Sequence, residues 1–189
     1  MFRKFGRTGE ILTVLVAAVL ICGIAAGEDN LLSNPSFERM KQTGVPEDWS
    51  RMIKPKLSGP FSMVQDAHHG DRAAFMRTEE WNYQRPQYLV QTVQLPRGAN
   101  SLTLSAYAKG YGSLKLSFRF LRAGEPHEVR KLNLGFGIIE TPAEENHEFA
   151  LAGVYDRYEA HQDIPAGAEA VMIKVGNTIG PLDRLNIWG

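Results

Sequence analysis

Apolar and polar residues alternate along most of this 189-residue chain. In residues 101–109, Leu102, Leu104, Ala106 and Ala108 occupy every second position, and residues 114–120 repeat the spacing. Because successive side chains of a strand point to opposite faces, a period of two predicts half-buried β-strands. Further strands are predicted at residues 61–66, 73–78, 88–95, 128–134, 157–164, 171–175 and 185–187.

Turns rich in glycine and proline separate these segments, at residues 58–60, 96–98, 110–112, 124–126 and 165–167. Many short strands spaced by turns, with no long helical pattern, predict an all-β jelly-roll sandwich of two antiparallel sheets. Each strand has one apolar face for the core and one polar face for water. No linker or repeat interrupts residues 28–189, so we interpret them as one domain.

The first 27 residues have the pattern of a secretory signal. Arg3, Lys4 and Arg7 precede an apolar stretch at residues 11–21, and small residues follow at 25–27. This stretch is short for a membrane-spanning helix, and charge follows it at once, although a retained anchor is the alternative. We therefore expect a signal helix at residues 1–27, followed by a domain that is secreted, periplasmic or in the cell envelope.

Cysteine and charge narrow the class of protein further. The single cysteine, Cys22, lies in the predicted signal, and Ile21 before it does not fit a lipoprotein signal. The mature chain would therefore have no disulfide. The whole chain has 21 basic and 21 acidic residues, and removing the signal takes away three basic residues and one acidic residue, which leaves a net charge of about −2. That charge argues against binding to nucleic acid and to anionic membranes.

A run of motifs resembles one family. Residues 30–38 read NLLSNPSFE and residues 44–49 read GVPEDW; further matches follow in order at residues 66–74, 88–95, 101–110, 158–167 and 182–185. In these segments the chain resembles the cellulose- and xylan-binding carbohydrate-binding modules (CenC-like, families 4, 9, 16 and 22), which have a galactose-binding-like jelly-roll fold. The resemblance implies a polysaccharide or glycan as the partner, and it places Trp49 in the core.

The resemblance also implies a structural calcium ion. Glu38 and Asp183 match the acidic positions that tie the two chain ends together in the family, and a carbonyl from the turn at residues 70–72, which contains Arg72, would complete the site. Calcium takes oxygen ligands of these kinds. The alternative is that both acids are ordinary carboxylates at the sandwich edge, and Arg184 is a competing partner for Asp183.

Sugar recognition needs flat aromatic rings beside groups that hydrogen-bond hydroxyls. One predicted surface is the outer face of the central sheet, with Tyr107, Lys109, Lys115, Arg119 and Gln91. The other is the polar loop at residues 79–85, which carries Trp81 and Tyr83. The alternative for this loop is that Trp81 folds back onto the edge of the sandwich.

Other chemistry has weaker support in the sequence. His68 and His69 lie near Asp66 and Asp71, and we interpret them as solvated turn residues and not as metal ligands. There is no G-x-S-x-G nucleophile motif and no H-E-x-x-H metal motif, and the adjacent acids at 79–80 and 144–145 are interpreted as solvated loops. We therefore expect an exported, non-catalytic carbohydrate-binding protein. A structural or adhesive cell-envelope protein with a protein partner is the alternative, and a glycoside hydrolase or lyase is a weaker one.

Overall fold

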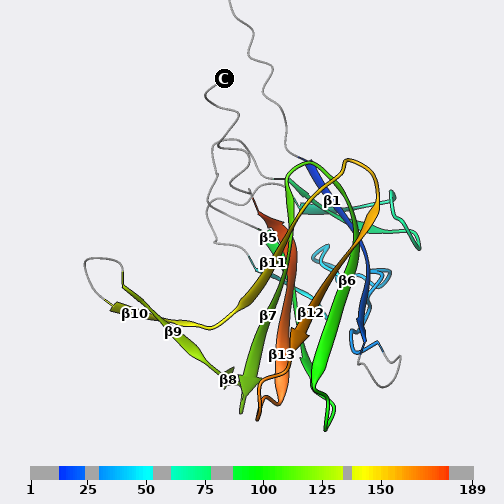
Figure 1. Ribbon diagram of the computed structural model, residues 1–189. Coiled ribbons are helices and arrows are strands. Elements are labelled where there is room, and N and C mark those ends of the chain that lie inside the picture. Colours follow the sequence, from blue (N-terminus) through cyan, green and yellow to red (C-terminus); the bar gives the residue numbers. More distant parts are fainter. Residues whose placement is uncertain (1–12, 24–29, 53–60, 78–86, 134–137, 179–189) are drawn as a thin grey trace, which may run out of the picture.

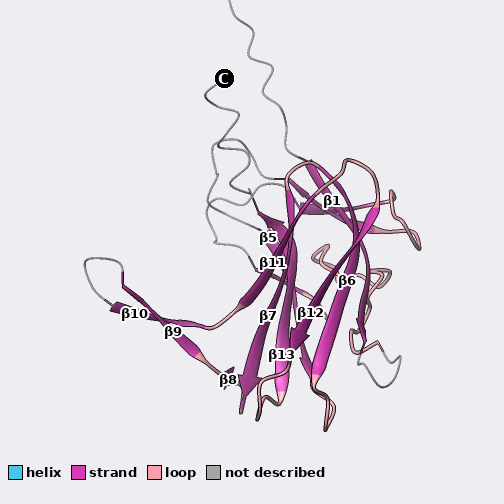
Figure 2. Cartoon of the chain, viewed as in Figure 1, coloured by secondary structure: helices cyan, strands magenta, loops and turns pink. Residues whose placement is uncertain are grey.

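The structure is a computed structural model that describes residues 13–23, 30–52, 61–77, 87–133 and 138–178 (Figure 1). These residues form strands, turns and loops (Figure 2), and their sheets are antiparallel, so the predicted all-β class is confirmed. Within the described ranges there is no helix with the length and hydropathy that crossing a membrane requires.

Two sheets make up the sandwich. The first, called here the β6 sheet, has the order β12 (Asp156–Asp163), β6 (Ser101–Gly110), β1 (Thr13–Gly23), β4 (Ala73–Arg77), β3 (Phe61–Val64). The second, the β7 sheet, has the order β11 (Glu145–Ala150), β7 (Ser113–Arg122), β13 (Ala170–Thr178), β5 (Gln87–Gln94), β2 (Ser50–Met52), and β8 (Glu125–Pro126) pairs with β7.

The core lies between the two sheets, as the alternating pattern predicts. Leu104 of β6, Phe118 of β7 and Ile173 of β13 have no solvent-exposed surface and belong to one apolar cluster. Tyr107 is only half-buried, whereas its neighbours on β6 at 106 and 108 are fully buried. The register predicted for β6, with Leu104 inward and Tyr107 outward, is therefore confirmed.

Strand β1 replaces the helix that was predicted for the signal segment. Its backbone pairs with β4 on one side and with β6 on the other. The segment contains Thr13, Val14, Val16, Val19 and Ile21, and such β-branched residues fit a strand at least as well as a helix. The strand also supplies hydrogen-bond partners to two neighbours at once, which a helix at this place would not do. Residues 1–12 and 24–29 lie outside the described residues.

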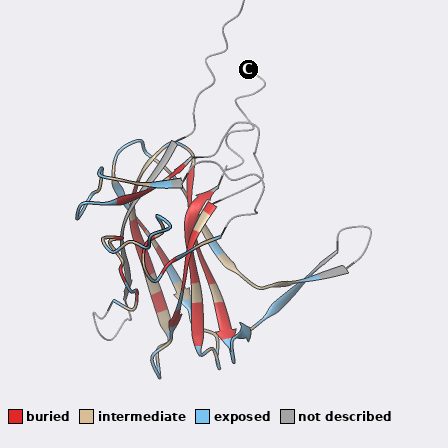
Figure 3. Cartoon of the chain, turned by 180° about the vertical axis from the view of Figure 1, so that it is seen from behind, coloured by how far each residue is buried: buried red, intermediate tan, exposed pale blue. Residues whose placement is uncertain are grey.

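Most other strands fall within a few residues of their predicted positions, but four were not predicted. These are β2, β8, which lies in the predicted turn at residues 124–126, β11, and β10 (Ile138–Pro142), which pairs with β9 (Val129–Asn133). The β9–β10 hairpin extends away from the two sheets (Figure 1), and its residues 129–131 and 140–142 are exposed or half-buried (Figure 3). The predicted strand at residues 185–187 lies outside the described residues.

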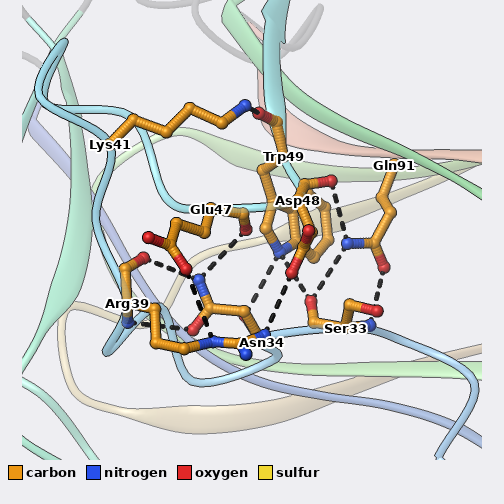
Figure 4. Close-up of polar contacts among 8 residues, drawn as sticks. All are labelled: Ser33, Asn34, Arg39, Lys41, Glu47, Asp48, Trp49 and Gln91. Carbon is orange, nitrogen blue, oxygen red and sulfur yellow. Dashed lines mark hydrogen bonds and ion pairs between the residues drawn. The ribbon is translucent and has the colours of Figure 1, made fainter.

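The family-like motif near the amino terminus forms a polar network around a buried tryptophan (Figure 4). Trp49 is fully buried, and its indole N–H donates to the carbonyls of Ser33 and Asn34, each at 3.2 Å. The ring of Phe37 packs edge-on against it, with centroids 5.4 Å apart. The predicted core position of Trp49 is confirmed, and this motif holds the loop against the sandwich.

Candidate functional site

Four aromatic rings gather on the outer face of the β6 sheet, and we call them the aromatic cluster: His68, His69, Tyr107 and Tyr155. The imidazole of His68 stacks on the ring of Tyr107, with centroids 3.9 Å apart and an interplanar angle of 8°. His69 stands edge-on to Tyr107 at 5.4 Å, and Tyr155 stands edge-on to His68 at 5.7 Å. Two loops and one strand therefore bring the rings together.

Charged groups border the aromatic cluster on one side. The Lys109 ammonium lies 2.5 Å from the Asp66 carboxylate and 4.5 Å from the centroid of the Tyr155 ring. The Tyr155 hydroxyl donates to the backbone carbonyl of Asp66. Burial, helped by the charge of Asp66, raises the pKa of Tyr155, so its hydroxyl stays a neutral donor at physiological pH.

The His68 stack changes which rings face the solvent. One face of Tyr107 is covered by His68, while His68 and His69 are themselves exposed. The interpretation of these histidines as solvated turn residues is therefore incomplete, because they are exposed but also packed on Tyr107. Their position before β4 showed a turn, but only the fold shows that this turn lies over β6.

The rest of the outer face beside β6 is polar. Arg157 of β12 lies opposite Tyr107, and its guanidinium pairs with Glu159. The imidazole of His161 lies 2.9 Å from the Glu159 carboxylate and 2.9 Å from the Thr103 hydroxyl. Stacked rings and a row of donors and acceptors thus share one open sheet face, which is the arrangement that polar ring-shaped ligands need.

The predicted sheet-face residues do not form one surface. Tyr107 and Lys109 lie on β6, whereas Lys115 and Arg119 lie on β7, with their side chains on the outer face of the opposite sheet. The expectation of a single face is wrong because β6 and β7, although joined by a tight turn, belong to different sheets. A hairpin turn in the sequence does not show that its two strands pair.

Arg119 belongs to a charged group with Glu144 and Lys174. The Glu144 carboxylate accepts from the Arg119 guanidinium at 2.7 Å and from the Lys174 ammonium. Burial alone would raise the pKa of Glu144, but the hydrogen bonds and charges of Lys174 and Arg119 hold it below its usual value. Glu144 was expected in a solvated loop, and that expectation is wrong because two cations from the sheet face hold it.

Gln91 lies away from any outer face. Its side chain is 5% exposed; its amide oxygen accepts from the Ser33 N–H, and its amide nitrogen donates to the carbonyls of Ser33 and Asp48, all at 3.0 Å (Figure 4). With these partners filled, Gln91 fastens the amino-terminal loop to β5. The prediction that Gln91 lies on the outer face of a sheet is wrong, because its side chain is buried on the same side of β5 as those of Leu89 and Val93.

The predicted calcium ligands are brought together in part. The Glu38 carboxylate accepts from the Asp71 N–H at 2.9 Å, and Glu38, Gln65 and the turn at residues 70–72 line one shallow pocket. Asp183 lies outside the described residues, as do Trp81 and Tyr83. In the described part of the chain, no three His, Cys, Asp or Glu side chains are grouped as metal ligands.

A second concave feature lies at the far end of β12, beside the base of the β9–β10 hairpin. This edge cleft has a volume of about 250 Å³, and it is lined by Phe118, Phe120, His127, Glu128, Ala143, Glu145, Gln162, Asp163, Ile164 and Pro165. Its lining mixes apolar side chains with three carboxylates, and Glu145 is already paired with Arg130. No residue predicted from the sequence as a ligand contact lies in it.

Comparisons with known proteins address the fold. No family model matches the chain, and no curated protein matches it. The enzymatically active domain of tailspike protein 4 from bacteriophage CBA120 is similar in structure, with a TM-score of 0.55 and 14% identity over 78% of this chain. The match covers 19% of that tailspike chain, so this chain spans about a fifth of its length.

A second solved structure also matches. It is the carbohydrate-binding module TmCBM61 in complex with β-1,4-galactotriose, with a TM-score of 0.47 and 19% identity over 80% of this chain and 90% of that one. At these identities the likeness concerns the fold alone. The chain is thus an all-β sandwich whose fold is similar to that of one part of the tailspike chain, and membership of the CenC-like family stays a prediction.

Proposed function

We propose that this protein is an exported, non-catalytic glycan-binding domain whose binding surface is the outer face of the β6 sheet around the aromatic cluster. The observation that carries the proposal is the stack of His68 on Tyr107, with the Lys109–Asp66 pair beside it, on an open sheet face. Exposed imidazole rings offer flat surfaces to the apolar face of a pyranose. Lys109, Asp66 and Arg157 offer donors and acceptors to its hydroxyls.

The surface is suited to binding a chain of sugars. It is an open face and not an enclosed pocket, so a polymer can cross it without an end being buried. The strand pairing places Arg157 opposite Tyr107 and His161 opposite Thr103, which extends the polar row along β12 for about 13 Å at the rise of an antiparallel strand. We therefore propose a polysaccharide as the ligand, in agreement with the family that the motifs resemble.

A structural calcium ion is a further part of this proposal. The pocket of Glu38, Gln65 and residues 70–72 offers carboxylate, amide and backbone oxygens, which is the donor set that calcium prefers. Glu38 and the turn carbonyls would hold the ion, with Asp183 as the third predicted ligand. His68 and His69 directly precede this turn, so an ion there would fix the loop that supplies two of the four rings of the aromatic cluster.

The experiment is a glycan array on the exported protein, with and without calcium, followed by calorimetry with each glycan found. His68→Ala and Tyr107→Ala should weaken binding by about 1 to 3 kcal/mol, the usual range for aromatic contacts at recognition surfaces, while the unfolding transition persists. The matched control is Tyr111→Ala, because Tyr111 is 65% exposed in the turn after β6 and lies outside the cluster. Equal losses in all three variants, or none, would refute this surface as the site.

The loop with Trp81 and Tyr83 is tested in the same titrations. If it contributes to binding, glycan should change the tryptophan fluorescence of the wild type but not that of Trp81→Ala, which keeps the other two tryptophans, Trp49 and Trp188. Trp81→Ala should then lose affinity without loss of folding. A protein captured from envelope extract through Trp81, with no response to any glycan, would instead favour the adhesive alternative.

A further inference from the structure

The edge cleft lies where edge strands of the two sheets, β11 and β12, come together. Asp163 ends β12 and Glu145 begins β11, and both residues line the cleft. Its volume of about 250 Å³ is below the range of roughly 300–1,000 Å³ that is usual for pockets enclosing drug-sized ligands. The edge cleft is therefore suited to a group about as large as one amino-acid side chain.

Apolar side chains form the more deeply buried part of the lining. Phe118 has no exposed surface and Phe120 is 8% exposed, whereas Ala143, Ile164 and Pro165 are half-buried. Covering apolar surface that was in contact with water favours binding. A ligand that fits this cleft therefore has an apolar part.

Three carboxylates border the edge cleft, and two of them have no basic partner. Glu145 pairs with Arg130. Within the described residues, no lysine or arginine forms an ion pair with Glu128 or Asp163. Both of these side chains are exposed, which places them at the mouth of the cleft. The mouth thus carries negative charge that no cation of the described chain neutralises.

The imidazole of His127 adds a buried acceptor to the lining. Its Nε2 lies 3.0 Å from the carbonyl oxygen of Ala166, which only accepts, so in the neutral ring Nε2 carries the hydrogen and Nδ1 is the acceptor. Nδ1 is buried and has no hydrogen-bond partner among the described residues. The Glu128 carboxylate, 3.7 Å away, has no hydrogen to donate to it. A buried acceptor without a partner costs free energy, so a ligand that donates a hydrogen bond here would remove that cost.

We propose that the edge cleft binds a protonated amine on a compact apolar body. An ammonium group has up to three donors and no acceptor, which matches a lining that offers carboxylates and an imidazole nitrogen. Its charge is complementary to Glu128 and Asp163, and hydrogen bonds between ionised groups are stronger than neutral ones. The apolar body would cover the phenylalanine side chains. The cleft shares no residue with the aromatic cluster, so this proposal does not rest on glycan binding.

The amine has two possible sources, a free organic amine and the lysine side chain of a peptide, and the probes distinguish them. Benzylammonium and benzyl alcohol share a ring and differ mainly in charge, and each is titrated into the exported protein at neutral pH and low salt, with binding followed by ligand-observed NMR. Benzylammonium should bind at least about tenfold more tightly. Equal affinities, or no binding of either probe, would overturn the proposal. Acetyl-lysine methylamide then represents the peptide source, and its affinity relative to benzylammonium decides between the two sources.

Substitutions at the mouth test whether the carboxylates hold the amine. Asp163→Asn and Glu128→Gln should each weaken benzylammonium binding by about three- to tenfold, because each removes one charged acceptor. The matched control is Glu140→Gln, which changes the net charge equally but lies on β10 outside the cleft, where Glu140 pairs with Lys131. The control should change the affinity by less than about twofold, since screening weakens distant charges. Equal weakening in the control and in Asp163→Asn would mean that the amine responds only to overall charge, which would overturn the proposal.

A substitution inside the cleft tests the position of the ligand. Ala143→Phe fills the space with a ring and keeps the backbone hydrogen bond from the residue 143 N–H to the Glu128 carbonyl, so it should abolish benzylammonium binding. Tyr107→Ala, in the aromatic cluster, should leave this binding unchanged. Unchanged binding to a folded Ala143→Phe protein would show that the amine binds elsewhere and would overturn the proposal. If Ala143→Phe does not fold, the carboxylate variants and their control decide the question.

Discussion

Replacing Glu144 by glutamine should destabilise the fold, although the sequence suggested a solvated loop at this position. Its carboxylate is the partner of Lys174, which is 5% exposed, and of Arg119. Burial lowers the pKa of Lys174, and the charge of Glu144 counters that shift by stabilising the ammonium. Without the carboxylate, Lys174 is left buried near the like charges of Arg119 and Lys115.

The magnitude follows from how much of this group is out of water. Removing one partner of a fully buried ion pair costs about 3 to 5 kcal/mol. The side chains of Glu144 and Arg119 keep 17% and 21% of their exposure, which reduces the cost. We therefore expect Glu144→Gln to lose about 2 to 3 kcal/mol of unfolding free energy. The matched control is Glu148→Gln, because the Glu148 carboxylate is 42% exposed and lies 3.9 Å from Lys115, so its loss should cost less than about 0.5 kcal/mol.

The assay is urea unfolding at neutral pH and through the acid range. Because the folded-state pKa of Glu144 is lowered, its stabilising contribution is present above the ordinary glutamate pKa of about 4.3 and is lost as the pH falls through the lower folded value. Glu144→Gln should therefore lack this part of the acid sensitivity. The double variant Glu144→Gln with Lys174→Met should recover most of the loss. Glu144→Gln and Glu148→Gln with equal, small effects would refute the reasoning.

Three further predictions concern the core and the turn over β6. Phe118→Ala should cost about 3 to 5 kcal/mol in urea unfolding, because its side chain is fully buried between the sheets, and a loss below 1 kcal/mol would contradict that packing. Gly70→Ala should lower the free energy of unfolding by about 1 to 2 kcal/mol and weaken any glycan binding. Gly70 has a φ of 71°, and an added Cβ would overlap the Glu38 carboxylate. An unchanged melting temperature would contradict this prediction. Calcium should raise the melting temperature of the wild type but not of Glu38→Gln or Asp183→Ala, and equal shifts in all three proteins would exclude the proposed ion site.

The sequence predicts the strands of this protein well, but it predicts less well which outward side chains share one surface. The difference arises because strand formation depends on local sequence, whereas the pairing of strands does not. Whether Leu104 faces the core is a local matter, since the period of two at β6 determines it. Which strands become neighbours is not local. Arg119 and Tyr107 both point outward, and they are separated because β6 and β7 join different sheets. Nothing in the turn between these strands distinguishes a hairpin from a crossover between layers.

In the aromatic cluster, too, the sequence predicts which way a side chain on a strand points but not which side chains from other segments contact it. Tyr107 was predicted to face outward because it is out of phase with Leu104 and Ala106, and it does so. The stack of His68 on its ring depends on the path of the loop before β4, and that path depends on Glu38, which holds the Asp71 N–H from 33 residues away. Because one carboxylate from the amino-terminal motif holds this loop, the position of His68 on the proposed ligand surface depends on that motif. Glu38→Ala, which removes the acceptor of this hydrogen bond, should therefore weaken glycan binding as well as any response to calcium, even though Glu38 itself need not touch the sugar.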